Sequence, residues 1–130
     1  MVKNNILIID DEKDFCSLIK VNLESVGNFE VFVAESGKSG IALAKSLRPD
    51  LILLDIKMPH MDGYEVLKRL KAGEDTVSIP VVILSANESD EAKVKALGLY
   101  GEAYVTKPVD IFDLKSKIET ILNGVGRAKI

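Results

Sequence analysis

Short apolar runs alternate with longer segments of mixed polarity along the whole chain. After the first run, apolar residues recur three or four positions apart, which is the spacing of one helix face, until Gly27 ends the segment. This face comprises Phe15, Leu18, Ile19, Leu23 and Val26. The alternation predicts strands at 6–9, 29–34, 51–55, 79–85 and 103–106. It predicts helices at 15–26, 36–47, 64–71, 87–97 and from 111 onward.

Five strands that alternate with five helices predict an α/β domain, a doubly wound (βα)5 parallel sheet with helices on both faces. The runs are apolar almost throughout, as expected of strands that are buried on both faces. We expect Ser36 to cap the second helix and Pro80 to occupy one of the first positions of the fourth strand. One domain over residues 1–123 suits the length of 130 residues, and 124–130 are predicted to form a frayed C-terminal tail.

Reactive side chains lie where four of the five expected strands end. Asp10 and Asp11 follow the first strand, and Asp55 ends the third. Ser85 ends the fourth strand and Lys107 follows the fifth. The carboxyl ends of parallel strands meet at one edge of a sheet, where ligands bind in folds of this kind. We therefore expect these five side chains to converge on one site.

Three neighbouring carboxylates would repel one another by an amount that matters against the small net stability of a domain. We therefore expect a cation among Asp10, Asp11 and Asp55, and ligation by oxygen atoms suits Mg²⁺ with retained waters and a shared phosphate. Lys107 adds a mobile positive charge and Ser85 a hydroxyl donor, which together can orient a phosphoryl group. An aspartate neutralised in this way can act as a nucleophile and form an acyl phosphate.

The composition of the chain favours a cytoplasmic protein that acts through a partner. The formal net charge is −3 and aromatic residues make up 5% of the chain, which argues against direct nucleic-acid binding. Cys16 is the single cysteine, which excludes an internal disulfide and fits a reducing cytosol. We expect no secretion and no membrane insertion, because an N-terminal apolar signal and an apolar stretch of bilayer length are both missing from the sequence.

The order of these residues resembles the receiver domain of two-component response regulators. The resemblance covers residues 4–122 and includes the stretch DIKMPHMDG at 55–63, which is similar to the acceptor loop of that family. It implies the flavodoxin-like strand order 2-1-3-4-5 and a single-domain receiver of the chemotaxis-regulator type, although a phosphorelay intermediate and a receiver cut from a longer chain stay open. A cis peptide bond between Lys107 and Pro108 is implied as well.

By this resemblance Asp55 is the phosphoacceptor, which takes a phosphoryl group from a phosphohistidine of a partner histidine kinase or histidine phosphotransfer protein. Mg²⁺ is then held by Asp11, Asp55 and the backbone carbonyl of Lys57, while Asp10 acts through a bound water. The chain is interpreted as a phosphoacceptor that assists its own phosphorylation and dephosphorylation, not as a turnover enzyme.

The resemblance also implies how the signal leaves the site. Ser85 and Lys107 contact the phosphoryl oxygens, and Tyr104 turns inward as the Ser85 hydroxyl moves toward the phosphate. This movement remodels the face formed by the fourth helix, the fifth strand and the fifth helix. The expected output is altered binding of a downstream protein partner or a phosphorylation-dependent dimer.

Two other functions stay open from the residues alone. A Mg²⁺-dependent phosphatase or phosphotransferase of the haloacid dehalogenase type also forms an aspartyl phosphate. Such enzymes place the nucleophile in an Asp-x-Asp pair after the first strand, whereas here Asp10 and Asp11 are adjacent and a cap insertion is missing. A phosphate-independent interaction module is the other alternative, and it predicts no mass change with a phosphodonor.

Each site residue taken singly has an ordinary structural explanation. Asp10 or Asp11 can cap the first helix, and a cap at one is compatible with metal ligation by the other. Ser85, Lys107 and Tyr104 can be a turn hydroxyl, a solvated charge and a strand aromatic.

Three further features are predicted to be structural. His60, the only histidine, is expected to be an exposed loop residue, and Cys16 a partly buried thiol without redox function. The charges on the fourth helix are expected to form a solvated face. They are Glu88, Asp90, Glu91, Lys93 and Lys95.

Overall fold

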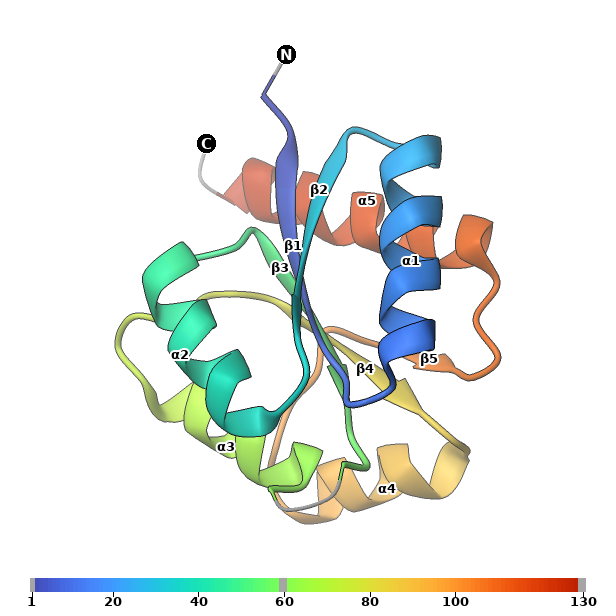
Figure 1. The fold of residues 1–130 in the computed structure, drawn as a ribbon. Helices are drawn as coiled ribbons and strands as arrows, with labels where there is room; N and C mark the ends of the chain where they lie inside the picture. Colours follow the sequence, from blue (N-terminus) through green and yellow to red (C-terminus); the bar gives the residue numbers. More distant parts are fainter. Residues whose placement is uncertain (1, 59–60, 129–130) are drawn as a thin grey trace.

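The chain folds into a five-stranded sheet that lies between two layers of helices (Figure 1). The computed structural model describes residues 2–58 and 61–128, with side chains described as far as residue 124. The alternation of strands and helices predicted from the apolar runs is confirmed. The elements are β1 Asn4–Ile9, α1 Lys13–Val26, β2 Phe29–Ala34, α2 Gly37–Leu47, β3 Leu51–Asp55, α3 Gly63–Ala72, β4 Val81–Ser85, α4 Glu88–Ala96, β5 Ala103–Thr106 and α5 Ile111–Ala128.

The strand order is β2-β1-β3-β4-β5, and every neighbouring pair is parallel. This confirms the predicted (βα)5 class and its order. Residues 6–9 of β1 and all of β3 and β4 are buried, whereas the edge strands β2 and β5 carry partly exposed residues. The most continuous apolar runs therefore correspond to the strands that are covered on both faces.

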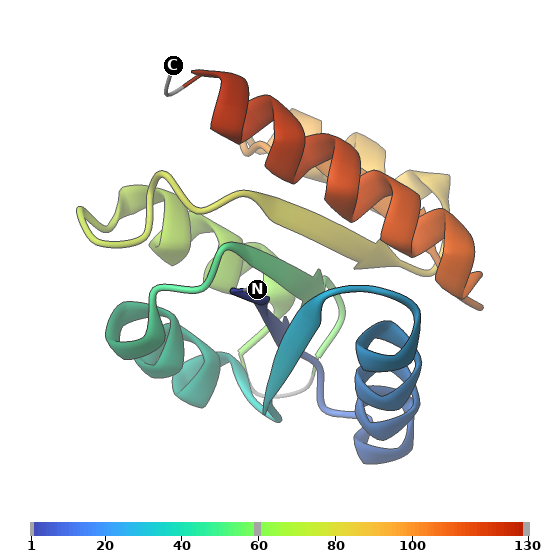
Figure 2. The same ribbon diagram turned by 90° about the horizontal axis from the view of Figure 1, so that it is seen from above.

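Helices α1 and α5 cover one face of the sheet, and α2, α3 and α4 cover the other. Figure 2 shows α2 and α3 on the side of the sheet away from α1. Leu18 was predicted on the buried face of α1 but is 58% exposed, and Cys16 occupies the core position instead. Within residues 2–58 and 61–128, each helix is too short or too polar to cross a membrane. The helix residues of the first layer that are buried are Cys16, Ile19, Leu23, Leu114 and Ile118.

Side-chain caps set the starts of the helices near the carboxyl edge of the sheet. Ser36 caps α2 as predicted, and Asp62 and Asn87 cap α3 and α4 through their side-chain oxygens. Gly63 opens α3 at a point where a Cβ atom would overlap the Cα of Ile56 and the carbonyl oxygen of the residue before it. The start of α3 therefore packs directly against the end of β3.

Two predicted boundaries are wrong. β4 begins at Val81, so Pro80 precedes the strand; its carbonyl accepts a hydrogen bond from the Ile52 N–H at 2.9 Å, but its ring nitrogen has no proton to donate to a ladder. Helix α5 continues to Ala128, so Gly124 does not begin a frayed tail. A glycine in a helix interior costs only about 1 kcal/mol relative to alanine, which the adjoining helical turns can offset.

Candidate functional site

The predicted side chains meet at the carboxyl edge of the sheet. Asp10 follows β1, Asp55 ends β3 and Ser85 ends β4. In the strand register Asp55 lies opposite Leu84, the residue before Ser85. Lys107 follows β5 and its backbone N–H donates to the carbonyl oxygen of Ser85 at 2.9 Å. Parallel pairing with matched register thus places the ends of four strands beside one another.

Three carboxylates form an acidic cluster at this edge. One oxygen each of Asp10, Asp11 and Asp55 lies within 4.8 Å of the others. Asp10 and Asp55 are buried, whereas Asp11 is exposed. Oxygen ligands at this spacing, with one side open to water, suit a hard divalent cation such as Mg²⁺.

Asp10 is fully buried and both of its carboxylate oxygens are engaged. Oδ1 accepts a hydrogen bond from the Glu12 N–H at 2.9 Å, and Oδ2 accepts one from the Lys107 ammonium at 2.8 Å. The N-cap of α1 is Glu12, without a side-chain cap hydrogen bond. The alternative prediction that Asp10 or Asp11 caps this helix is therefore wrong, because the Asp10 carboxylate closes a tight turn before the helix begins.

Asp55 is 6% exposed, and its carboxylate has a perturbed pKa. Oδ1 accepts a hydrogen bond from the Lys57 N–H at 3.1 Å, and Oδ2 lies 3.8 Å from the Lys107 ammonium. Burial, followed by the negative charge of Asp10, raises the pKa of Asp55 to about 6 against these stabilising contacts. Desolvation and a like charge thus make the charged form of Asp55 costly when no cation is bound.

Lys107 is a cation that Asp10 and Asp55 share. Its ammonium donates to Asp10 at 2.8 Å and to Glu12 at 3.0 Å, and it lies 4.2 Å from the centre of the Phe15 ring. Burial opposes the charged form, but the hydrogen bonds to Asp10 and Glu12 outweigh it and raise the pKa of Lys107. The bond between Lys107 and Pro108 is cis, as predicted.

Sequence reasoning missed the parts that Glu12 and Phe15 play around Lys107. Glu12 directly follows the acidic pair, which was the available signal, although a third acid in a row gives no indication of its partner. Phe15 was assigned to the apolar face of α1 and its ring also faces the ammonium, a favourable cation–π arrangement.

Ser85 and Tyr104 lie at the expected positions of the sheet. Ser85 is 3% exposed at the end of β4, where it pairs with Thr106 of β5. Tyr104 pairs with Ile83, is partly buried and packs against the core layer beneath α2, α3 and α4. The Tyr104 ring therefore packs on the same face of the sheet as α4.

Cys16, predicted to be structural, can be compared with the fold, whereas His60 cannot. Cys16 is 1% exposed, more deeply buried than predicted, and its thiol donates to the carbonyl oxygen of Asp10 at 3.3 Å. Burial, together with the charge of Asp10, raises the pKa of Cys16 to about 12, so the thiol stays protonated and unreactive at neutral pH. His60 lies outside the described residues.

Asp90 differs most from its predicted environment. It was assigned to a solvated face of α4, yet it is 2% exposed. Its Oδ2 accepts from the Ala86 N–H at 2.8 Å, and its Oδ1 lies 3.3 Å from the Lys57 ammonium and 3.4 Å from the Tyr64 hydroxyl. Burial favours the neutral acid, but the Ala86 N–H and Lys57 outweigh it and lower the pKa of Asp90. Asp90 is therefore a buried carboxylate next to the candidate site.

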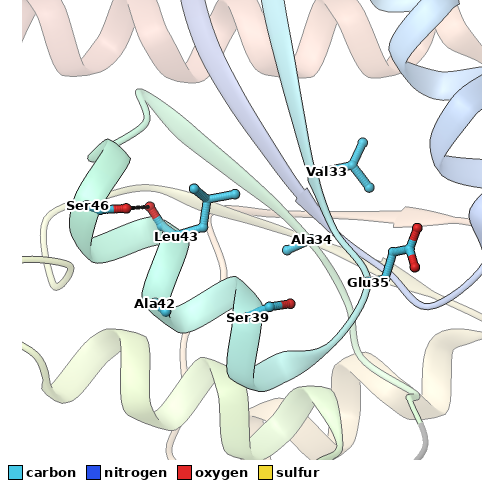
Figure 3. A pocket seen from close by; sticks show the side chains of 7 residues that line it. All are labelled: Val33, Ala34, Glu35, Ser39, Ala42, Leu43 and Ser46. Carbon is cyan, nitrogen blue, oxygen red and sulfur yellow. Dashed lines mark hydrogen bonds between the residues drawn. The ribbon is translucent and has the colours of Figure 1, made fainter.

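A groove of about 640 Å³ lies between β2 and α2, and Asp10, Asp11 and Asp55 are not among its lining residues (Figure 3). Its lining is mostly apolar or small, with Val33, Ala42 and Leu43 among the residues, and Glu35 provides a charge. The hydroxyl of Ser46 donates to the carbonyl oxygen of Leu43 at 3.3 Å, so it is already used by the helix. The groove lacks the converging charges found among the described residues at the carboxyl edge.

The fold and the acidic edge together define a class of signalling phosphoacceptor. The chain matches the model of the response regulator receiver domain over residues 6–119. It belongs to the response regulator receiver domain family. Members of this family are phosphorylation-driven signalling switches of two-component systems that bind Mg²⁺ at an acidic pocket, and they are not typical turnover enzymes. The two alternative functions are not favoured by this match.

Relatives of the chain include both longer proteins and proteins of its own length. RpaA of Synechocystis sp., a DNA-binding dual master transcriptional regulator, is 38% identical over 94% of this chain and 50% of RpaA. Protein PilH of Pseudomonas aeruginosa is 35% identical over 92% of this chain and 98% of PilH. The crystal structure of a CheY-like receiver domain protein from Methanospirillum hungatei superimposes with a TM-score of 0.86. The match covers 97% of this chain and 98% of that chain, at 30% sequence identity. The chain thus spans about half the length of RpaA and nearly all of PilH.

Proposed function

We propose that Asp55 is the phosphoacceptor of this receiver domain and that its donor is a phosphohistidine on a histidine kinase or histidine phosphotransfer protein. The observation that carries the proposal is the environment of Asp55. Its carboxylate is buried beside two other carboxylates and lies 3.8 Å from the Lys107 ammonium. A carboxylate whose charge is costly until a cation arrives is suited to metal-dependent phosphoryl transfer.

The acidic cluster supports Mg²⁺ ligation by Asp11, Asp55 and the backbone carbonyl of Lys57. Asp10 already has both oxygens engaged, so it is suited to contact the ion through a water. Asp11 is exposed and can turn its carboxylate toward the ion. Bound Mg²⁺ would neutralise the carboxylates and the phosphoryl oxygens.

The transfer exchanges one bond to phosphorus for another. An oxygen of Asp55 forms the new P–O bond while the P–N bond of the phosphohistidine breaks. The imidazole nitrogen leaves with the electron pair of that bond and takes up a proton from solvent. Lys107 neutralises the added charge and the Ser85 hydroxyl donates to a phosphoryl oxygen. Water later cleaves the acyl phosphate, which restores the carboxylate and releases inorganic phosphate.

The signal would leave through the face formed by α4, β5 and α5, with Ser85 and Tyr104 as the residues that move. Two large aromatic side chains are exposed on the segments that flank β5: Tyr100, before the strand, is 65% exposed, and Phe112, at the start of α5, is 68% exposed. Aromatic side chains are enriched in protein–protein interfaces. They support a downstream protein partner or a phosphorylation-dependent dimer as the output.

The acceptor assignment can be tested by intact-mass spectrometry after incubation with Mg²⁺ and acetyl phosphate. The wild-type protein is expected to gain the mass of one phosphoryl group, and hydroxylamine should remove it because the linkage is an acyl phosphate. Asp55→Asn is expected to gain no such mass. Asp75→Asn is a matched control, because Asp75 is an exposed carboxylate in the loop that enters β4 at the opposite edge of the sheet. Equal labelling of the wild type and Asp55→Asn would refute the assignment.

A further inference from the structure

Asp90 joins two loops that flank the candidate acceptor. Lys57 lies in the loop after β3; its backbone N–H donates to Asp55 at 3.1 Å while its ammonium lies 3.3 Å from Asp90. Ala86 follows Ser85 at the end of β4, and its N–H donates to Asp90 at 2.8 Å. Asp90 therefore contacts the loops on both sides of the site from its position on α4.

Helix α4 has few other attachments to the domain. Asp90 and Val94 are its two buried residues, and the other positions from Glu88 to Ala96 are exposed or intermediate. A helix that buries so little apolar surface depends on its polar contacts for its position. Tyr64 of α3 adds a hydroxyl at 3.4 Å from the Asp90 carboxylate. The Asp90 contacts are therefore a large share of what holds α4 in place.

The two partners of the Lys57–Asp90 ion pair differ in their freedom to move. The Lys57 side chain is 59% exposed, whereas that of Asp90 is 2% exposed. The ammonium can swing on its flexible stem into solvent or toward another anion. The Asp90 carboxylate has no such freedom, and a buried carboxylate that loses its cation is left in an unfavourable environment.

We propose that Asp90 and a phosphoryl group on Asp55 compete for the ammonium of Lys57, and that this competition links phosphorylation to the position of α4. The inference rests on the proposed function, because it takes Asp55 as the acceptor. A phosphoryl group places more negative charge beside Lys57 than the carboxylate alone. When the ammonium turns to it, Asp90 keeps the Ala86 N–H and the Tyr64 hydroxyl but loses its counterion, and α4 loosens. Asp90 is a positioning residue in this scheme, since it acts through Lys57.

Hydrogen exchange of the α4 amides tests this scheme, with intact-mass spectrometry on the same samples. The variants are Lys57→Met, Lys57→Arg and Asp90→Asn. Lys95→Met is the control, because Lys95 is an exposed α4 lysine that pairs with Glu91 on its own helix. Without phosphodonor, Lys57→Met and Asp90→Asn should each raise α4 exchange roughly three- to tenfold. In the double variant Lys57→Met/Asp90→Asn, α4 exchange should exceed that of Asp90→Asn only slightly, because both changes remove the same contact. Lys57→Arg and Lys95→Met should match the wild type.

With Mg²⁺ and acetyl phosphate, the wild type should gain mass and its α4 exchange should rise toward that of Lys57→Met. Lys57→Met keeps the backbone carbonyl at position 57 that the proposed metal site uses, so it should still gain mass, but with little further rise in α4 exchange. A merely structural role for the lysine side chain would leave the full phosphorylation-dependent rise in place. Unchanged α4 exchange in unphosphorylated Lys57→Met overturns the link to α4. A phosphorylated Lys57→Met that shows the full wild-type rise overturns the competition alone. A wild type that gains no mass overturns the proposed function and the competition with it.

Discussion

The ammonium of Lys107 lies 2.8 Å from Oδ2 of Asp10, although the strands that precede them, β5 and β1, are not neighbours in the sheet. Strands β3 and β4 lie between them. The long lysine side chain therefore spans the carboxyl edge and lies over the ends of both intervening strands. This geometry brings the same ammonium to 3.8 Å from Asp55.

Replacement of Lys107 should separate phosphorylation from its structural effect. We expect Lys107→Ala to keep its fold and to accept phosphate from acetyl phosphate, but to lose the change in the α4–β5–α5 face. Metal-free stability should fall by about 2–3 kcal/mol, since Asp10 is left buried without its cation. Amide NMR shifts of α4, β5 and α5, recorded with and without phosphodonor, measure the effect. Lys117→Ala is the control, because Lys117 pairs with the exposed Asp113 on α5. Wild-type shift changes in Lys107→Ala would contradict the role of Lys107.

Asp55→Asn should stabilise the metal-free protein at neutral pH. Folding raises the pKa of Asp55 from 3.8 to about 6, so the folded state binds a proton more readily than the unfolded state. Stability should therefore rise as the pH falls from above 6 toward 4, by up to about 3 kcal/mol for this group. The variant lacks this titration.

Urea unfolding in EDTA at pH 7.5 and pH 5 measures this effect. The difference between the wild type and Asp55→Asn isolates Asp55, because every other titrating group is common to both proteins. A difference that is the same at both pH values would show that the Asp55 carboxylate is not destabilised by its surroundings.

Mg²⁺ should raise the thermal midpoint of unfolding of the wild type, because the acidic cluster binds the ion in the folded state. A Mg²⁺ concentration one hundred times the Kd raises the free energy of unfolding by about 2.7 kcal/mol. Asp11→Asn should lose most of this gain, and Asp14→Asn should keep it, since Asp14 lies on the first turn of α1 and outside the cluster. Thermal scans at equal ionic strength with NaCl as the reference separate binding from screening. An equal gain in both variants would remove Asp11 from the ligand set.

Gly63→Ala should destabilise the domain by about 2–3 kcal/mol, because the new methyl group would overlap the Cα of Ile56 and the carbonyl oxygen of Asp55. The backbone after β3 would have to move, which should also weaken Mg²⁺ binding. Gly124→Ala provides a comparison of opposite sign: a Cβ there meets open space within α5, so it should stabilise by up to about 1 kcal/mol. Urea midpoints give both values, and a neutral Gly63→Ala would show that the loop relaxes freely.

Much of the fold and the site could be predicted from residue types and their spacing. The apolar runs at β1, β3 and β4 were long and continuous enough to mark buried parallel strands. Parallel strands share one carboxyl edge, so the convergence of Asp10, Asp11, Asp55 and Lys107 followed from their places after those strands. The end of α5 could not be predicted in this way, because Gly124 weakens a helix without forbidding it.

The sequence by itself determined the class of fold and which side chains reach the carboxyl edge, since both depend on the periodicity of apolar residues and on chain direction. Tertiary structure alone decided the partners of the charges at and beside the candidate site. Glu12 and Phe15 contact Lys107 because the segment after β1 and the loop after β5 meet at the carboxyl edge. Asp90, one acid among several on a polar helix, is buried because α4 turns it toward Lys57 and Ala86. The physical reason is that burial and ion pairing depend on contacts between residues distant in the chain, which a local pattern does not encode.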